Sequence, residues 1–164
     1  MTRKPRVQSQ QDNIVSPQTS YQILSILKGA VKRGTGKSLN SIQYPIAGKT
    51  GTTNDSKDLW FFGLTPKFVV GVYVGYDNPK KIGYRETGSS VALPIFKSFM
   101  EAYLKKDLDK DIDFFIPDNI ILKKIDPNTG IFETKNSSII EYFTKDQLET
   151  INNLNKVNTI GGIN

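Results

Sequence analysis

Three short segments, joined by tight turns, constrain the fold of this chain most. Residues 46–53 read Ile-Ala-Gly-Lys-Thr-Gly-Thr-Thr, residues 59–65 read Leu-Trp-Phe-Phe-Gly-Leu-Thr, and residues 68–76 begin with Phe-Val-Val-Gly-Val-Tyr-Val. Their β-branched and aromatic residues favour strands, and the connections, Asn-Asp-Ser-Lys and Pro-Lys, are typical of turns. Connections this short join antiparallel neighbours, so the sequence predicts a three-stranded antiparallel sheet.

Two helices are predicted to flank this sheet. The first covers residues 17–33, because Ser16 can accept a hydrogen bond from a first-turn amide and Pro17 suits the first helical position. Gly34 is predicted to end it as a left-handed cap. The second helix begins near Pro94. At a period of 3.6 residues, one broad face of the first helix is apolar and consists of Ile23, Leu24, Ile26, Leu27, Ala30 and Val31.

Composition divides the chain into four stretches. Residues 1–15 lack periodicity and are expected to form a tether, and residues 16–106 contain the sheet and its helices. After an acidic run, residues 107–150 are expected to form a small extension, in which residues 120–125 pair with residues 131–134 across an Asp-Pro-Asn-Thr-Gly turn. Residues 151–164, which are rich in Asn, are expected to be disordered. The predicted fold class is α+β, with a small C-terminal hairpin extension.

Cysteine and histidine are both absent from the chain. Their absence excludes disulfides, thiolate and imidazole metal ligands, and a serine–histidine pair. A serine enzyme built on this sequence would therefore need another base, and lysine is the usual substitute.

The net charge of +6 is uneven, since residues 1–106 carry +10 and residues 107–164 carry −4. A basic surface can attract nucleic acid, an anionic surface or an acidic substrate. The lysines and arginines are scattered, and no basic motif with stacking aromatic residues stands out. The sequence therefore predicts no nucleic-acid partner.

The triplet Lys49-Thr50-Gly51 gains meaning from its surroundings. With Ala47-Gly48 before it and two apolar strands after it, it resembles the Lys-Thr-Gly strand of the transpeptidase domain of penicillin-binding proteins, and it is most similar to the class A, bifunctional branch. The resemblance covers residues 16–143. It implies that residues 16–106 are the C-terminal part of that domain and that residues 107–150 are the extension that follows it.

The resemblance also implies roles for four residues. Lys49 would be catalytic, by assisting proton transfer and attracting the anionic substrate. Thr50 and Thr52 would hold the carboxylate of a D-Ala-D-Ala stem peptide or of a β-lactam, and Gly51 would let the substrate backbone approach closely. No metal or organic cofactor is implied. The sequence Gly-Thr-Gly at residues 34–36 also matches class A wording, and it is interpreted as a helix cap.

The chain contains two decoys for the other family motifs. Ser25-x-x-Lys28 and Ser38-x-Asn40 match their wording, but they lie only about ten residues apart. Helical geometry also puts Ser25 and Lys28 on the solvent side, where nothing would activate the serine. The nucleophile is therefore expected upstream. The parent would be a serine-type D-Ala-D-Ala transpeptidase, and this chain alone would be inactive.

Two other functions match part of the sequence. A non-catalytic peptidoglycan- or peptide-binding module could use the same strand edge. A nucleotide-binding protein is suggested by Gly48-Lys49-Thr50 and Gly36-Lys37-Ser38, but Gln43 and Val31 stand where the phosphate loop requires a further glycine. The nucleotide-binding hypothesis therefore does not meet the spacing that the motif requires.

The expected location follows from the resemblance. The parent would act on the periplasmic face of the bacterial inner membrane. No apolar run approaches the ~18 to 20 residues that span a bilayer, and residues 1–11 do not resemble a signal peptide, so any targeting segment or anchor is expected upstream. The strand at residues 68–76 would also lack an outer neighbour, which predicts self-association.

Overall fold

The computed structural model describes residue 12, residues 14–106 and residues 112–160, with side chains up to residue 153. Its first sheet has the predicted form. β1 (Ala47–Thr52), β2 (Leu59–Leu64) and β3 (Val69–Val74) lie in the order β1-β2-β3, and both pairs are antiparallel. In this part of the chain β1 and β3 are the two edges of the sheet, and the overall class is α+β, as predicted.

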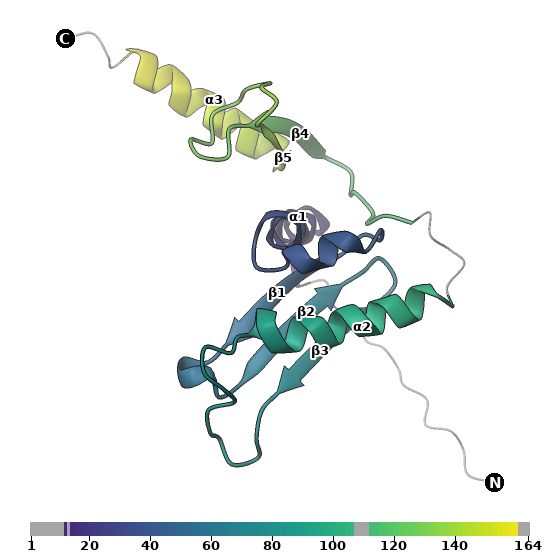
Figure 1. The fold of residues 1–164 in the computed structure, drawn as a ribbon. Coiled ribbons are helices and arrows are strands. Elements are labelled where there is room, and N and C mark those ends of the chain that lie inside the picture. Colours follow the sequence, from purple (N-terminus) through teal and green to yellow (C-terminus); the bar gives the residue numbers. More distant parts are fainter. Residues whose placement is uncertain (1–11, 13, 107–111, 161–164) are drawn as a thin grey trace.

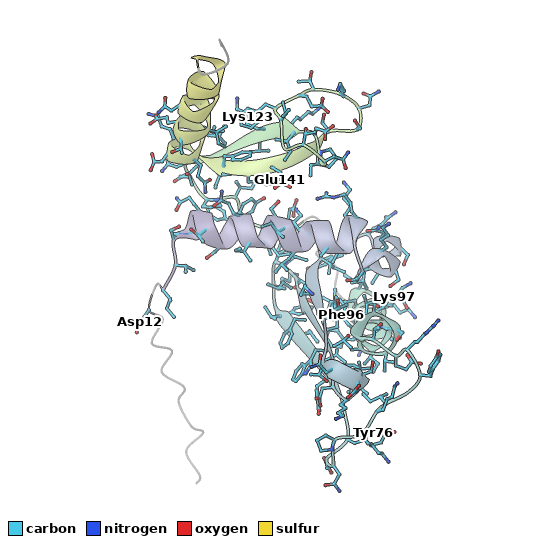
Figure 2. The ribbon with its side chains drawn as sticks, turned by 90° about the vertical axis from the view of Figure 1, so that its left-hand side faces the viewer. Asp12, Tyr76, Phe96, Lys97, Lys123 and Glu141 are labelled. Carbon is cyan, nitrogen blue, oxygen red and sulfur yellow. The ribbon has the colours of Figure 1, made fainter. Side chains whose placement is uncertain are left out.

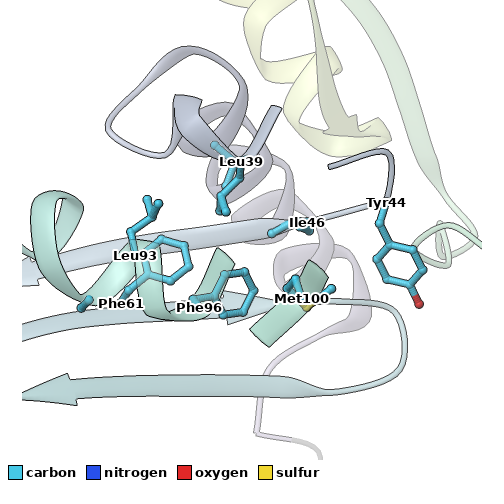
Figure 3. Close-up of a cluster of buried hydrophobic side chains, with 9 residues drawn as sticks. Leu39, Tyr44, Ile46, Phe61, Leu93, Phe96 and Met100 are labelled. Carbon is cyan, nitrogen blue, oxygen red and sulfur yellow. The ribbon is translucent and has the colours of Figure 1, made fainter. Parts of the chain in front are cut away.

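One face of the sheet is covered by α2 (Leu93–Leu104), which follows the single π-helical turn η3 (Gly88–Ala92) (Figure 1). The Phe61 and Phe96 rings meet there, with 4.9 Å between their centroids. A Cβ on Gly63 would lie 2.2 Å from the Phe96 ring, so glycine on β2 lets the helix approach closely. The largest fully buried side chains, several of them shown in Figure 3, are Phe61, Phe96, Leu39, Leu59, Leu93 and Met100.

The first helix, α1, has the predicted bounds, Pro17–Arg33. The Ser16 side chain accepts a hydrogen bond from the Thr19 amide at 3.1 Å, as expected for its cap. The prediction of a left-handed Gly34 is wrong, because its φ is −104°. Instead, the amides of Gly34 and Gly36 both donate to the Ala30 carbonyl, each at 3.1 Å. Glycine is needed for space, since a Cβ on Gly34 would lie 2.8 Å from the Ala30 oxygen.

α1 packs between two sheets (Figures 1 and 2). Val31 joins the core of the first sheet, whereas the buried Tyr21 ring meets Tyr142 edge-on in the second, at 5.0 Å between centroids. The single apolar face that the sequence predicts is therefore wrong in part, because Ile23 and Ile26 are 53% and 59% exposed. Counting one apolar face assumes one packing partner, and this helix has two.

Because the hairpin also packs on α1, the predicted exposure of Ser25 and Lys28 is wrong. Ser25 and Lys28, predicted on the solvent side, are half-buried and line a groove whose other wall is formed by residues 138–142. Lys28 also forms an ion pair with Asp113, with 3.6 Å between Nζ and Oδ1. The polar side of α1 thus faces the C-terminal hairpin.

The hairpin forms with a different second strand from the one predicted. β4 (Ile120–Ile125) pairs antiparallel with β5 (Ile139–Thr144) over its full length. Of the predicted partner, residues 131–134, Phe132 bridges Ile125 and the Glu133 amide donates to the Lys124 carbonyl at 3.0 Å. The tight turn is present, with Gly130 at φ +72°. Residues 139–144 pair with β4 in place of residues 131–134 because they form the longer run of β-branched and aromatic residues.

The structure describes part of the C-terminal tail, residues 151–164, whose expected disorder stays a prediction. α3 (Lys145–Ile160) begins directly after β5 and continues through residues 151–160, while residues 161–164 lie outside the description. Thr144 and Gln147 form a reciprocal cap, in which the Gln147 amide donates to Thr144 Oγ1 at 3.3 Å and the Thr144 amide donates to Gln147 Oε1 at 2.9 Å. Nowhere in the described ranges is a helix both long and apolar enough to cross a bilayer.

Two further expectations fall largely outside the described residues. The predicted tether, residues 1–15, is described only at residue 12 and residues 14–15, and residues 107–111 of the acidic boundary are not described. The division of the chain at residues 106 and 107 therefore stays a prediction.

Replacing Phe96 with alanine tests the packing of α2 on the sheet. Phe96 is fully buried, so we expect Phe96→Ala to lower the free energy of unfolding by about 3–5 kcal/mol. Phe62→Ala is the matched control, because Phe62 is 46% exposed and should cost about 1 kcal/mol or less. Urea denaturation of the three proteins measures both effects. Equal losses for the two variants would contradict this account of the core.

Candidate functional site

All four residues that the sequence singles out lie on β1. Side chains alternate along a strand, so Lys49 and Gly51 belong to one face of the sheet and Thr50 and Thr52 to the other. Lys49 and Thr52 are exposed, whereas Thr50 and Gly51 are half-buried. Among the described strands β1 pairs only with β2, so no described strand pairs with its outer backbone edge, and pairing with such an edge is one way in which proteins bind extended peptides.

Lys49 belongs to the face opposite α2. It lies across from Phe62 in the register, and its Nζ donates to the Thr50 carbonyl at 2.8 Å. The same face carries stacked aromatic rings, with 5.4 Å between the centroids of Trp60 and Phe62 and 4.6 Å between those of Trp60 and Tyr73. Lys49 therefore places a positive charge beside an exposed aromatic surface.

The turn after β1 is fixed by a carboxylate. The Tyr73 hydroxyl donates to Asp58 Oδ1 at 2.8 Å, and the Thr53 hydroxyl donates to Asp58 Oδ2 at 3.2 Å. The Asp58 amide in turn donates to Thr53 Oγ1 at 2.9 Å. The bond to Asp58 raises the pKa of Tyr73, because the carboxylate favours the protonated phenol. These bonds tie β1, β2 and β3 together at the end nearest Thr52.

Thr52 is held by the turn that precedes α2. The Gly88 amide donates to Thr52 Oγ1 at 3.0 Å. A Cβ on Gly88 would lie 2.3 Å from the Trp60 carbonyl oxygen and 2.7 Å from that of Gly51, so only glycine brings this amide so close to the sheet. The reciprocal cap of Thr87 and Ser90 shapes the same turn.

Thr50 has a hydroxyl neighbour that the sequence analysis missed. Thr35, in the loop after α1, lies with its Oγ1 3.1 Å from the Oγ1 of Thr50. The sequence analysis interpreted Gly34, Thr35 and Gly36 only as a helix cap. The available signal was a threonine between two glycines, which a cap alone does not require.

Neither decoy joins β1. Asn40 donates from Nδ2 to the Lys32 carbonyl at 3.1 Å, which satisfies the end of α1, and Leu39 is buried in the core. Ser25 lies in the groove beside the hairpin. Lys28 forms its ion pair with Asp113, in the segment that leads to the hairpin.

Comparison with known families gives one match over most of the chain. A family model described as "Penicillin binding protein transpeptidase domain" matches residues 2–101. That range includes β1 together with the loop after α1 and η3, which contact Thr50 and Thr52.

The chain is also similar to curated proteins and to a solved structure. It is 48% identical over 136 residues to penicillin-binding protein 1A of Rickettsia conorii, covering 82% of this chain and 17% of that protein. It is 43% identical over 121 residues to penicillin-binding protein 1A of Pseudomonas aeruginosa, covering 73% of this chain and 14% of that protein. The crystal structure of penicillin-binding protein 1A from Haemophilus influenzae matches with a TM-score of 0.70 and 30% identity, over 80% of this chain and 21% of that one. The chain thus spans less than a quarter of each of these proteins.

Replacing Gly88 with alanine tests whether this turn holds the site strand. Two fixed backbone oxygens would meet the new Cβ, so we expect Gly88→Ala to lower the free energy of unfolding by about 1–3 kcal/mol and to shift the NMR signals of Gly51 and Thr52. Gly29→Ala is the control, because its close neighbour is the flexible Arg33 side chain and alanine favours a helix by about 0.5–1 kcal/mol. Unchanged stability and spectra in Gly88→Ala would refute the role of the turn.

Proposed function

Because the chain belongs to the penicillin-binding protein transpeptidase family, we propose that β1 is the substrate-holding strand of a peptidoglycan transpeptidase. In the parent enzyme, a serine attacks the peptide bond between the last two D-Ala residues of a stem peptide, which forms an acyl ester and releases the terminal D-Ala. An amine of a neighbouring stem then attacks this ester, which forms the cross-link and frees the serine. A β-lactam reacts with the same serine. The observation that carries this proposal is the placement of Lys49, Thr50, Gly51 and Thr52 together on an edge strand of the sheet.

Each of these residues suits a part of that reaction. A carboxylate only accepts hydrogen bonds, and the hydroxyls of Thr50 and Thr52 can donate to it while Lys49 supplies positive charge. Gly51 has no side chain to keep a peptide from the strand edge. In this proposal Lys49 also assists proton transfer, and the Thr52 amide donates to the oxyanion that forms during acylation.

The nucleophile is proposed to come from a part of the parent other than this chain. The similar proteins are several times longer, and Ser25 has no base to activate it, since Lys28 is paired with Asp113. Residues 16–106 then form the C-terminal part of the transpeptidase domain, and residues 107–150 form its extension. The site of action proposed for the parent is the periplasmic face of the bacterial inner membrane, where stem peptides are exposed.

A fluorescent penicillin tests this division of labour. We expect the chain alone to form no stable covalent adduct, because acylation requires an activated serine. Intact-mass spectrometry measures the result. A stoichiometric adduct on Ser25 would contradict the proposal.

A chimera supplies the positive arm of the same test. In it, this chain replaces the matching segment of the Rickettsia conorii protein, to which it is 48% identical. The chimera should be labelled by penicillin, and Lys49→Ala should reduce the labelling rate at least about tenfold, as expected for loss of a catalytic group. Lys57→Ala is the control, since Lys57 is a nearby lysine paired with Asp55 at 3.8 Å. Equal labelling of both variants would remove Lys49 from the mechanism.

The open edge of β3 leads us to propose that the isolated chain self-associates. Val69 and Tyr73 on this strand are 63% and 49% exposed, and an uncovered apolar edge is a template for pairing with another copy. Within the described residues β4 pairs with β5, so the hairpin does not cover that edge.

Sedimentation velocity measures this self-association. We expect the average mass to rise with concentration and Val69→Lys to suppress the rise, because a charge on an edge strand opposes pairing. Ile140→Lys, on the other sheet at 48% exposure, is the control. A strict monomer at the highest concentration would exclude self-association.

A further inference from the structure

The loop after α1 is shaped to bring one hydroxyl to the site strand. Gly34 and Gly36 both donate from their amides to the Ala30 carbonyl, and a Cβ on Gly36 would lie 2.8 Å from the Cα of Val31. The Ala30 carbonyl is therefore satisfied by two glycine amides, and Thr35 is not needed for this bond. The Thr35 side chain between them contacts Thr50 Oγ1, at 3.1 Å.

A pair of hydroxyls can share its protons in two ways. Either Thr35 donates to Thr50, which leaves the Thr50 proton free, or Thr50 donates to Thr35. A carboxylate bound at Thr50 can only accept, so it selects the arrangement in which Thr35 donates and the Thr50 proton points at the ligand. The donation from Thr35 also polarises the Thr50 hydroxyl and strengthens its outgoing bond.

Thr52 has the same arrangement in a fixed form. Its Oγ1 accepts from the Gly88 amide at 3.0 Å, and an amide N–H can only donate. The Thr52 proton is therefore directed away from Gly88. Each of the two threonines on β1 thus has a donor behind it, an amide for Thr52 and the Thr35 hydroxyl for Thr50.

We propose that Thr35 is a positioning residue for the substrate carboxylate, which acts by donating to Thr50 so that the Thr50 hydroxyl donates to the ligand. This inference rests on the proposed function of β1. It assigns chemistry to a loop that otherwise serves only to end a helix.

The experiment uses NMR on the chain itself and has two readouts. The first is the set of three-bond couplings that report the Thr50 side-chain rotamer without any ligand. We expect one rotamer in the wild type, averaging in Thr35→Val and recovery in Thr35→Ser, which restores the hydroxyl. Thr129→Val is the control, because Thr129 lies in the turn between β4 and β5.

The second readout is the affinity for acetyl-D-Ala-D-Ala, measured from the amide signals of β1. Thr35→Val should weaken binding about three- to tenfold, because it removes the hydrogen bond from Thr35 to the hydroxyl that donates to the carboxylate. Thr35→Ser should restore the affinity. The same peptide with a C-terminal carboxamide should bind both proteins equally, because an amide terminus can itself donate.

The outcomes separate the two proposals. Equal carboxylate affinity in wild type and Thr35→Val, together with a loss in Lys49→Ala, overturns the role of Thr35 and leaves the proposed function standing. No binding of the carboxylate peptide by the wild type overturns the assignment of β1 as the carboxylate-holding strand, and the positioning role with it, even where the Thr50 rotamer depends on Thr35.

Discussion

The contact between the Phe96 ring and the bare backbone of Gly63 is the interaction on which the rest of the first sheet depends. It lets α2 lie close to β2, which brings the turn in front of the helix against the strand carbonyls. In that turn the Gly88 amide donates to Thr52 Oγ1. The turn that holds the Thr52 hydroxyl on β1 thus precedes a helix whose close approach requires glycine at position 63 of β2.

Much of this arrangement could be predicted from local patterns. Short turns between β-branched and aromatic runs predicted all three strands and their pairing, and the Ser16-Pro17 start predicted α1 to its ends. The candidate residues on β1 were found for the same reason, since they are consecutive and their motif is read directly along the chain.

The rest depends on contacts between segments that sequence patterns do not connect. Gly88 and Thr52 are 36 residues apart, and Gln22 reaches the Tyr142 carbonyl, 120 residues away. Amphipathic counting assumes one partner for a helix, so the second sheet beside α1 was missed. The start of α3 did have a local signal, because Thr144 and Gln147 have the spacing of a capping box. The Asn-rich composition of the residues that follow suggested disorder instead.

α1 also determines how the chain can be exchanged between relatives. Val31 anchors it to the core of the first sheet, while Tyr21 and Gln22 fasten it to the hairpin through Tyr142. Along the sequence, the acidic run looks like a suitable point at which to join segments of two related proteins. The first sheet, before that point, and the hairpin, after it, nevertheless both pack on α1. A recombinant that takes its hairpin from another lineage must therefore also inherit the tyrosine and glutamine on α1 that fit it.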